Sequence, residues 1–285
     1  MAIVLDGKKL AQTIREELVE QVDRLREKGI WPKLAVVLVG NDPGSVLYAQ
    51  AKQRSCEKTG IGYELYIFTE QATDQEILML IRQLNRDDEV HGIMMELPLP
   101  SGLNQGKILR EISYRKDVDG VNPTNRGFLL SKSEGLFPVT PQSCIEIIRQ
   151  YGLPIAGQHV VLVGRGETVG KPLIYMMLNE NATVTVCHTK TADLSHHVRQ
   201  GDIVVVAAGR PKMITAEMIK PGAVVVDAGI NETPEGVCGD VDYHEVIQVA
   251  GAISPVPGGV GSLTTVLLQK NLLKAIELYR LRSER

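Results

Sequence analysis

Apolar and polar positions along the chain follow two alternating patterns. Short runs of almost only apolar residues, such as the one from Leu34 to Val39, are typical of strands buried on both faces. The longer segments between these runs place apolar residues every three or four positions, as an amphipathic helix does. Strands are predicted at 34–39, 63–68, 92–97, 160–163, 183–187, 203–207 and 224–227. This alternation predicts an α/β fold in which helices cover parallel sheets.

The predicted helices carry start and stop signals. Asp6 can cap the first helix, whose apolar residues recur at helical spacing, and Gly29 can end it. A second helix is predicted from Gly44-Ser45 to about Gly60. The segment Thr73-Asp-Gln-Glu76 has the pattern of a capping box, which predicts the start of a third. The first half of the chain therefore alternates helix and strand.

The same alternation starts again after Phe137, which indicates a second domain. Thr140 can cap a helix in which Pro141 takes the first position, and this helix is predicted to run to Tyr151. The last amphipathic run, from Leu263 to Leu281, is expected to pack back on the first half of the chain. We expect one domain formed by residues 1–139 and 264–285, and a second formed by residues 140–263.

Charge and cysteine content narrow the class of protein. The formal net charge is −3 with both signs interspersed, so no broad attraction to nucleic acid or to an anionic membrane is expected. The apolar runs are far shorter than the ~20 residues that a membrane-spanning helix needs. The 4 cysteines are scattered, without a C-x-x-C pair and without a secretory signal before them. A cytoplasmic protein with a small-molecule ligand is expected.

The loop after the predicted strand 160–163 has the context of a dinucleotide site. It contains Gly164, Gly166 and Gly170, so its pattern is G-x-G-x-x-x-G, one residue longer than the usual fingerprint. Glycines allow backbone N–H groups to approach a phosphate, and the helix that follows adds a partial positive charge. The spacing also fits a simple tight turn, but the strand, turn and helix order favours phosphate binding and a Rossmann-like domain.

The residues after the next strand bear on the choice of cofactor. An NAD-selective site usually places an acidic residue there to bind the ribose 2′-hydroxyl, but the segment contains His188, Thr189 and Lys190. Together with Arg165 they can receive a 2′-phosphate, so NADP is favoured over NAD. The alternative is that they are ordinary solvated side chains.

The first half offers candidates for acid and base chemistry. Tyr48 and Lys52 share one face of the helix predicted at 44–60, which fits a cleft wall that moves protons or an ordinary surface lysine. Glu96 lies at the carboxyl end of a strand, the edge at which open α/β sheets bind ligands. Asp117 and Asp119 add two carboxylates in a loop. No further acid or histidine stands at ligand spacing, so no metal is expected.

Taken together, these motifs resemble those of the methylenetetrahydrofolate dehydrogenase/methenyltetrahydrofolate cyclohydrolase family, in the same order and over nearly the whole chain. The residues that carry the resemblance are Tyr48 with Lys52, the turn 97–100, the loop 116–120, Thr140-Pro141, Gly164-Arg165, the segment 169–172, the segment 182–188, Pro221-Gly222, the segment 229–231, the segment 239–242 and the loop 255–261.

The resemblance implies two α/β domains around a cleft, a homodimer, and oxidation of 5,10-methylenetetrahydrofolate to 5,10-methenyltetrahydrofolate with NADP, followed by hydrolysis to 10-formyltetrahydrofolate. It implies a role in catalysis for Tyr48, Lys52, Glu96 and Asp119. Asp119 would hydrogen-bond the pterin, Tyr48 would orient it and Lys52 would serve hydrolysis. The implied folate contacts are these four residues with Leu97, Pro257, Gly258 and Gly259. The implied cofactor contacts are Gly164, Arg165, Gly166, Gly170, His188, Thr189 and Ile230.

Three departures from the family pattern affect function, and one is Ser262-Leu263, which stands where Pro-Met is usual. Gly166 stands where the family has serine, which removes a hydroxyl that could bind the 2′-phosphate. Glu96 stands where glutamine is usual, and a carboxylate beside Lys52 favours the ammonium form, which is the wrong form for a base. Either Glu96 weakens hydrolysis or Glu96 itself acts as the base. The alternatives are therefore a dehydrogenase without hydrolase activity and a folate- and nucleotide-binding protein without turnover.

Overall fold

The computed structural model describes residues 2–281, and these form two compact units. The three-strand unit consists of Thr13–Phe137 and the segment from Thr265 onward, and the six-strand unit consists of the segment through Gln12 and Pro138–Thr264. The chain passes from one unit to the other within helix α1 (Gly7–Glu27) and again within helix α10 (Gly261–Ile276). The sequence prediction placed the first residues with the three-strand unit. They belong to the other unit because strand β1 pairs with β11.

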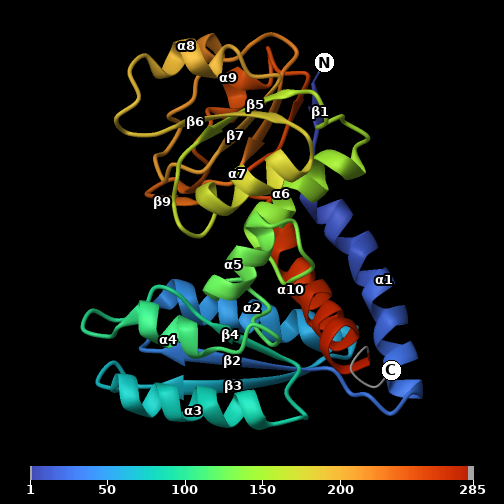
Figure 1. The fold of residues 1–285 in the computed structure, drawn as a ribbon. Helices are drawn as coiled ribbons and strands as arrows, with labels where there is room; N and C mark the ends of the chain where they lie inside the picture. The colour runs from blue at the N-terminus through green and yellow to red at the C-terminus, as the bar shows by residue number, and fades with distance from the viewer. Residues whose placement is uncertain (1, 282–285) are drawn as a thin grey trace. The chain divides into compact units, whose positions relative to one another are not determined.

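The three-strand unit is built on a parallel sheet in the order β3-β2-β4. Its strands are β2 (Lys33–Val39), β3 (Gly62–Phe68) and β4 (Gly92–Met95), and its other helices are α2 (Pro43–Thr59), α3 (Asp74–Arg86), α4 (Gln105–Glu111) and α5 (Pro123–Leu130). Alternate residues of β2 and β4 pack against buried residues of α3 and α4 on one face (Figure 1). The buried runs of the sequence therefore form strands covered by helices, as predicted.

Local signals place these helices. Asp42 caps α2 by accepting a hydrogen bond from the Ser45 N–H at 2.8 Å, and Gly60 ends this helix with a left-handed backbone. The predicted capping box of α3 is present, with Thr73 and Glu76 bonded reciprocally. The sheet face opposite α3 meets α10, whose Leu272 Cδ1 would be 3.0 Å from a Cβ at Gly92.

The final helix belongs with the first half of the chain, as predicted. The Asn271 side chain of α10 donates to the carbonyl oxygens of Val118 and Phe137 at 2.7 and 2.8 Å, and Gln269 donates to Ser55 Oγ at 3.0 Å. A π-helical turn, Glu277–Leu281, extends α10. No helix among residues 2–281 is both long and apolar enough to cross a membrane.

The six-strand unit is a parallel sheet in the order β1-β11-β8-β7-β5-β6. Its strands are β1 (Ile3–Val4), β5 (His159–Val163), β6 (Thr183–Cys187), β7 (Ile203–Val206), β8 (Val224–Asp227) and β11 (Ala252–Ile253). Its helices are α6 (Val139–Gln150), α7 (Gly170–Asn179), α8 (Leu194–Val198) and α9 (Tyr243–Val246), with a β9-β10 hairpin at Asn231–Thr233 and Gly236–Cys238. Helices α8 and α9 lie on one side of this sheet, and α6 and α7 on the other (Figure 1).

The strand register places four strand ends at one edge. Val163 pairs with Cys187 and with Val206, and Val206 pairs with Asp227, so β5, β6, β7 and β8 end level with one another. The loops that follow them therefore gather at the carboxyl edge, where parallel α/β sheets bind ligands.

One predicted helix start is wrong. Helix α6 begins at Val139 with Pro138 in the capping position and no side-chain cap, so Thr140 does not cap it and Pro141 is not its first residue. Thr140 lies inside the first turn, and Pro141 is tolerated there because the first N–H groups of a helix have no intrahelical partner.

Candidate active site

Lys52 and Glu96 form a buried ion pair in the three-strand unit. Lys52 comes from α2 and Glu96 follows the last residue of β4, and their side chains are only 11% and 5% exposed. Lys52 Nζ donates to both carboxylate oxygens of Glu96, at 2.9 and 3.1 Å. The Glu96 backbone N–H still bonds to Val37 of β2, which fixes the position of the carboxylate at the sheet edge. The structure thus places Glu96 beside Lys52, the contact on which the expected effect of Glu96 depends.

Tyr48 and Tyr63 are the aromatic neighbours of this pair. The Tyr48 ring lies one helical turn from Lys52, with its centroid 5.5 Å from Nζ, and its side chain is exposed, so a ligand can reach it. Tyr63 of β3 donates from its hydroxyl to the Ala49 carbonyl oxygen at 2.9 Å. Burial, and then the charge of Glu96, raises the pKa of Tyr63. The sequence analysis did not select Tyr63, because a tyrosine in a strand has no pattern of its own.

Asp117 and Asp119 have different environments although they are two residues apart. Asp117 is fully buried and accepts hydrogen bonds from the Val121 and Asn122 N–H groups and from the Asn125 side chain, at 2.8 to 3.0 Å. These bonds fix the loop after β4, which makes Asp117 structural. Asp119 is only partly buried and remains accessible to a ligand.

The electrostatic setting of Asp119 is unusual for a carboxyl. Desolvation by the surrounding protein, followed by the charge of Asp117, raises its pKa to about 7. Lys52 and Arg126 oppose this shift and Glu96 adds to it, so Asp119 lies within electrostatic range of the buried ion pair. A carboxyl that titrates near neutral pH beside a lysine is a candidate for binding or proton chemistry.

The other residues at this edge belong to the turn after Glu96. Leu97 is partly buried and packs on the cluster formed by β2, β4, α3 and α4. The Leu97-Pro98 peptide bond is cis. The turn stops β4 at Met95, two residues before the predicted end, because the prolines cannot continue the pairing.

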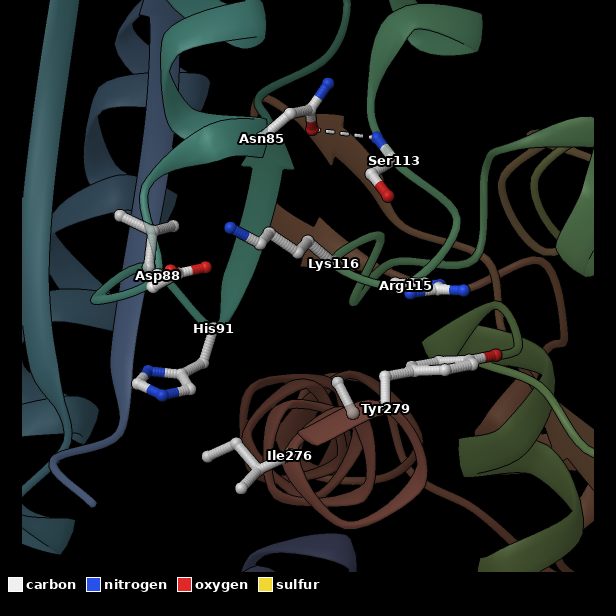
Figure 2. Close-up of a pocket in the computed structure, with 10 residues that line it drawn as sticks. Asn85, Asp88, His91, Ser113, Arg115, Lys116, Ile276 and Tyr279 are labelled. Carbon is white, nitrogen blue, oxygen red and sulfur yellow. Dashed lines mark hydrogen bonds between the residues drawn. The ribbon is translucent and has the colours of Figure 1, made fainter. Parts of the chain in front are cut away.

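A cavity of about 650 Å³ lies at the other end of β4, next to His91. Figure 2 shows Lys116 among the residues that line this cavity. Lys116 Nζ donates to the carbonyl oxygens of Leu84 and Asp87 at 3.0 and 2.6 Å. Asn85 accepts a hydrogen bond from the Ser113 N–H at 2.9 Å (Figure 2). Burial lowers the pKa of Lys116. These polar groups hold α3 to the loop before Asp117, which is a structural task. We therefore place the candidate site at the other end of β4, next to Glu96.

In the six-strand unit, the glycines of the loop between β5 and α7 have different tasks. Gly164 has a φ of +120°, and a Cβ there would lie 2.1 Å from the Ala207 carbonyl oxygen. A Cβ at Gly170 would lie 2.5 Å from the Gly164 carbonyl oxygen. A Cβ at Gly166 would meet nothing within 4 Å. The extra residue in the spacing therefore lengthens an exposed loop and leaves the two packing glycines in place.

The predicted cofactor residues converge on the carboxyl edge of this sheet. Arg165 is exposed in the loop after β5, and His188 and Thr189 follow β6 directly. His188 is held by its N–H bond to Thr191 Oγ1 at 2.8 Å. Ile230 follows β8 and is 52% exposed. Glycine-lined backbone, basic side chains and the absence of an acid at 188–190 fit the phosphates of a dinucleotide.

Two buried aspartates support this edge, and the sequence analysis did not identify their role. Asp240 accepts hydrogen bonds from the N–H groups of Ala208, Gly209 and Arg210 and from the Asn231 side chain, at 2.6 to 2.9 Å. Asp227 accepts from three further N–H groups, and burial raises its pKa to about 6. The aspartates thereby fix the loops after β7 and β8.

The loop that precedes α10 also lies in the six-strand unit. The Val256-Pro257 bond is cis, and Gly258 has a φ of +116°. The Gly258 carbonyl oxygen accepts from the Gly7 N–H at 2.9 Å, and a Cβ at Gly259 would lie 2.5 Å from the Pro255 carbonyl oxygen. The structure therefore assigns Pro257, Gly258 and Gly259 to a tight loop in this unit, while Lys52, Glu96 and Asp119 belong to the three-strand unit.

Within the part of the chain that the structure describes, no three His, Cys, Asp or Glu side chains are grouped as metal ligands would be.

Two family models match the chain in sequence order. The catalytic domain of tetrahydrofolate dehydrogenase/cyclohydrolase matches residues 5–119, and the NAD(P)-binding domain of the same enzymes matches residues 138–280. The chain belongs to the tetrahydrofolate dehydrogenase/cyclohydrolase family. This confirms the predicted resemblance and the two-part α/β fold, and the NAD(P)-binding match contains the loop at 164–170.

Relatives in the tetrahydrofolate dehydrogenase/cyclohydrolase family are similar over almost their full length. The bifunctional protein FolD of Pelotomaculum thermopropionicum is 60% identical over 98% of both chains. The FolD structure from Campylobacter jejuni has a TM-score of 0.96 and 43% identity over 97% of this chain and 99% of that one. The Trypanosoma brucei structure, complexed with NADP cofactor and inhibitor, has a TM-score of 0.93 and 34% identity over 100% of this chain and 99% of that one.

Proposed function

We propose that the protein oxidises 5,10-methylenetetrahydrofolate to 5,10-methenyltetrahydrofolate with NADP, and hydrolyses the methenyl compound to 10-formyltetrahydrofolate. Family membership over both domains supports the pair of reactions. The observation that carries the assignment of the site is the buried Lys52–Glu96 pair within electrostatic range of Asp119. In the first reaction a hydride leaves the one-carbon bridge. In the second a water oxygen adds to that carbon, the bond from the carbon to N5 breaks, and of the two water protons one ends on N5 and the other is released.

The residues of the three-strand unit bind the folate and handle the proton. Ionised Asp119 accepts hydrogen bonds from the N–H groups of the pterin, which orients the ring. The exposed Tyr48 ring stacks against the ligand beside Lys52. Lys52 serves the proton chemistry of hydrolysis, with Glu96 as its buried partner. Leu97 completes this part of the folate site. Pro257, Gly258 and Gly259 are the further folate contacts that the resemblance to the family implies.

The loop at the carboxyl edge of the six-strand unit binds the cofactor. Bound NADP supplies an acceptor for the hydride. The backbone at Gly164, Gly166 and Gly170 approaches the phosphates, and Arg165 with His188 and Thr189 receives the 2′-phosphate, while Ile230 contacts the cofactor nearby. These residues favour NADP over NAD because no acid follows β6 to bind a free 2′-hydroxyl.

We also propose a homodimer in the cytoplasm. The resemblance to the family supports the dimer. The cysteines support a reducing compartment, since Cys56, Cys144 and Cys187 are buried free thiols.

Two absorbance assays test the function. The first follows formation of methenyltetrahydrofolate from methylenetetrahydrofolate with NADP or NAD. The second follows its decay with protein and no oxidised cofactor. Formation together with decay faster than in buffer supports both activities. Formation without faster decay supports a dehydrogenase alone and points first to the contact between Lys52 and Glu96. Binding without turnover would overturn the enzymatic proposal.

Replacing Glu96 by glutamine should accelerate hydrolysis near neutral pH. Glutamine offers one acceptor oxygen where the carboxylate offers two, and it carries no charge, so it holds Lys52 Nζ less firmly and leaves it freer to act on the attacking water. We expect a rise of about tenfold in the decay rate of methenyltetrahydrofolate at saturating substrate. A fall would identify Glu96 as the base, and unchanged hydrolysis at every pH would contradict both roles. Glu64→Gln removes the carboxylate of a Lys–Glu pair elsewhere in this sheet and is the matched control.

A serine at position 166 should strengthen NADP binding. No left-handed backbone and no neighbour within 4 Å oppose a side chain there, so Gly166→Ser should fold normally. A hydrogen bond from its hydroxyl to a charged phosphate contributes about 1.5 kcal/mol or more, which predicts a roughly tenfold rise in kcat/KM for NADP. The ratio of kcat/KM for NADP and NAD measures this. Gly166→Ala, which lacks the hydroxyl, should leave the ratio unchanged, and an equal rise in both variants would contradict the hydrogen bond.

A further inference from the structure

The one-carbon states of the proposed substrate differ in charge. The bridge is neutral in methylenetetrahydrofolate, carries a positive charge in methenyltetrahydrofolate, and is neutral again in 10-formyltetrahydrofolate. The affinity of a site that binds all three therefore depends on the charge of the site. The charge of the residues beside Lys52 decides which of the three folates is bound most tightly.

The described residues beside Lys52 balance its positive charge locally. Glu96 holds the ammonium with both carboxylate oxygens and is 5% exposed, so solvent screens this carboxylate poorly. Asp119 lies within electrostatic range of both residues of this pair and of Asp117 and Arg126. Of these groups, Glu96 is the one that contacts Lys52 Nζ directly.

We propose that Glu96 makes the folate site selective for the cationic methenyl form over the neutral one-carbon forms. The inference rests on the proposed function, since it takes the folate to bind beside Lys52 and Asp119. Without the Glu96 carboxylate, the Lys52 ammonium would lose the two oxygens that contact it directly and would repel the methenyl cation more strongly. The ligand does not have to contact the carboxylate, because charges in poorly solvated surroundings interact over several ångströms.

The experiment compares the binding of a cationic and a neutral folate. Methenyltetrahydrofolate and 5-formyltetrahydrofolate are mixed rapidly with protein in the absence of cofactor, and the unbound folate is separated by rapid filtration and measured by its absorbance before hydrolysis consumes the ligand. We expect Glu96→Gln to raise the Kd for the methenyl cation by about tenfold or more and to change the Kd for the neutral folate by less than about threefold.

Two further variants separate charge from structure. Glu96→Asp keeps the negative charge and should retain most of the selectivity, so it also tests the inference if glutamine disturbs folding. Glu64→Gln, whose pair with Lys33 spans β2 and β3, should leave both Kd values unchanged. An equal change in both Kd values in Glu96→Gln, or loss of selectivity in Glu96→Asp, would overturn the inference while leaving the proposed function intact. Failure of the unaltered protein to bind either folate would overturn both.

Discussion

In an Asp119→Asn variant, the KM for methylenetetrahydrofolate should rise by about 10- to 100-fold at pH 8 and should no longer depend on pH. Hydrogen bonds from the pterin to an ionised carboxylate contribute about 1.5–3 kcal/mol, and an amide cannot replace their charge. In the unaltered protein, burial and Asp117 raise the pKa of Asp119 to about 7. The carboxyl is therefore protonated below that pH and ionised above it, so folate binding should tighten as the pH rises through 7.

Initial-rate measurements of the dehydrogenase reaction between about pH 6 and 8 test this. The KM of the unaltered protein should fall by roughly tenfold per pH unit below the pKa and level off above it, as expected for one titrating group. The ratio between variant and unaltered protein should therefore be small at low pH and largest at high pH. Asp23→Asn, on the exposed side of α1, is the control and should change neither KM nor its pH profile. A KM for the asparagine variant that still follows pH would exclude Asp119 as the titrating group.

The strong apolar periodicity of this chain predicted most of the fold. Runs such as 203–207 are long and apolar enough to specify a buried strand without tertiary information. Strands β1 and β11 were missed because each has two residues, and the pairing that defines them joins Ile3 to Ala252. No local pattern of that length distinguishes a strand from a loop. The same contact explains why the first residues belong to the six-strand unit.

The sequence predicted the chemical groups of the site better than the geometry of their contacts. Lys52 and Glu96 are 44 positions apart, and the bidentate contact between them depends on where α2 packs against the sheet. Asp117 and Asp119 look alike in the sequence, and only the hydrogen bonds to Asp117 separate a structural carboxylate from an accessible one. The tasks of Gly164, Gly166 and Gly170 likewise follow from which backbone atoms lie close to each of them.

Replacing Lys52 by methionine should reduce methenyltetrahydrofolate hydrolysis by about 100-fold or more. A positioned general base contributes about 10²- to 10⁴-fold to a rate, and methionine has a similar length without a proton acceptor of comparable basicity. Oxidation of methylenetetrahydrofolate should fall by less than about tenfold, because hydride transfer depends on positioning of the folate and cofactor. Parallel assays of formation and decay of the methenyl compound measure the two effects, and an equal loss in both would contradict a specific role in hydrolysis.

The stability of the same variants separates chemistry from folding. Lys52→Met leaves the buried Glu96 carboxylate without its ammonium partner, which should lower the free energy of unfolding by about 3–5 kcal/mol. Adding Glu96→Gln removes the uncompensated charge, so the double variant should recover most of that stability in a denaturant titration. It should not recover hydrolysis, because neither side chain can then accept a proton. If hydrolysis returned together with stability, the loss in Lys52→Met would come from a distorted site, and Lys52 would be a structural partner of Glu96 only.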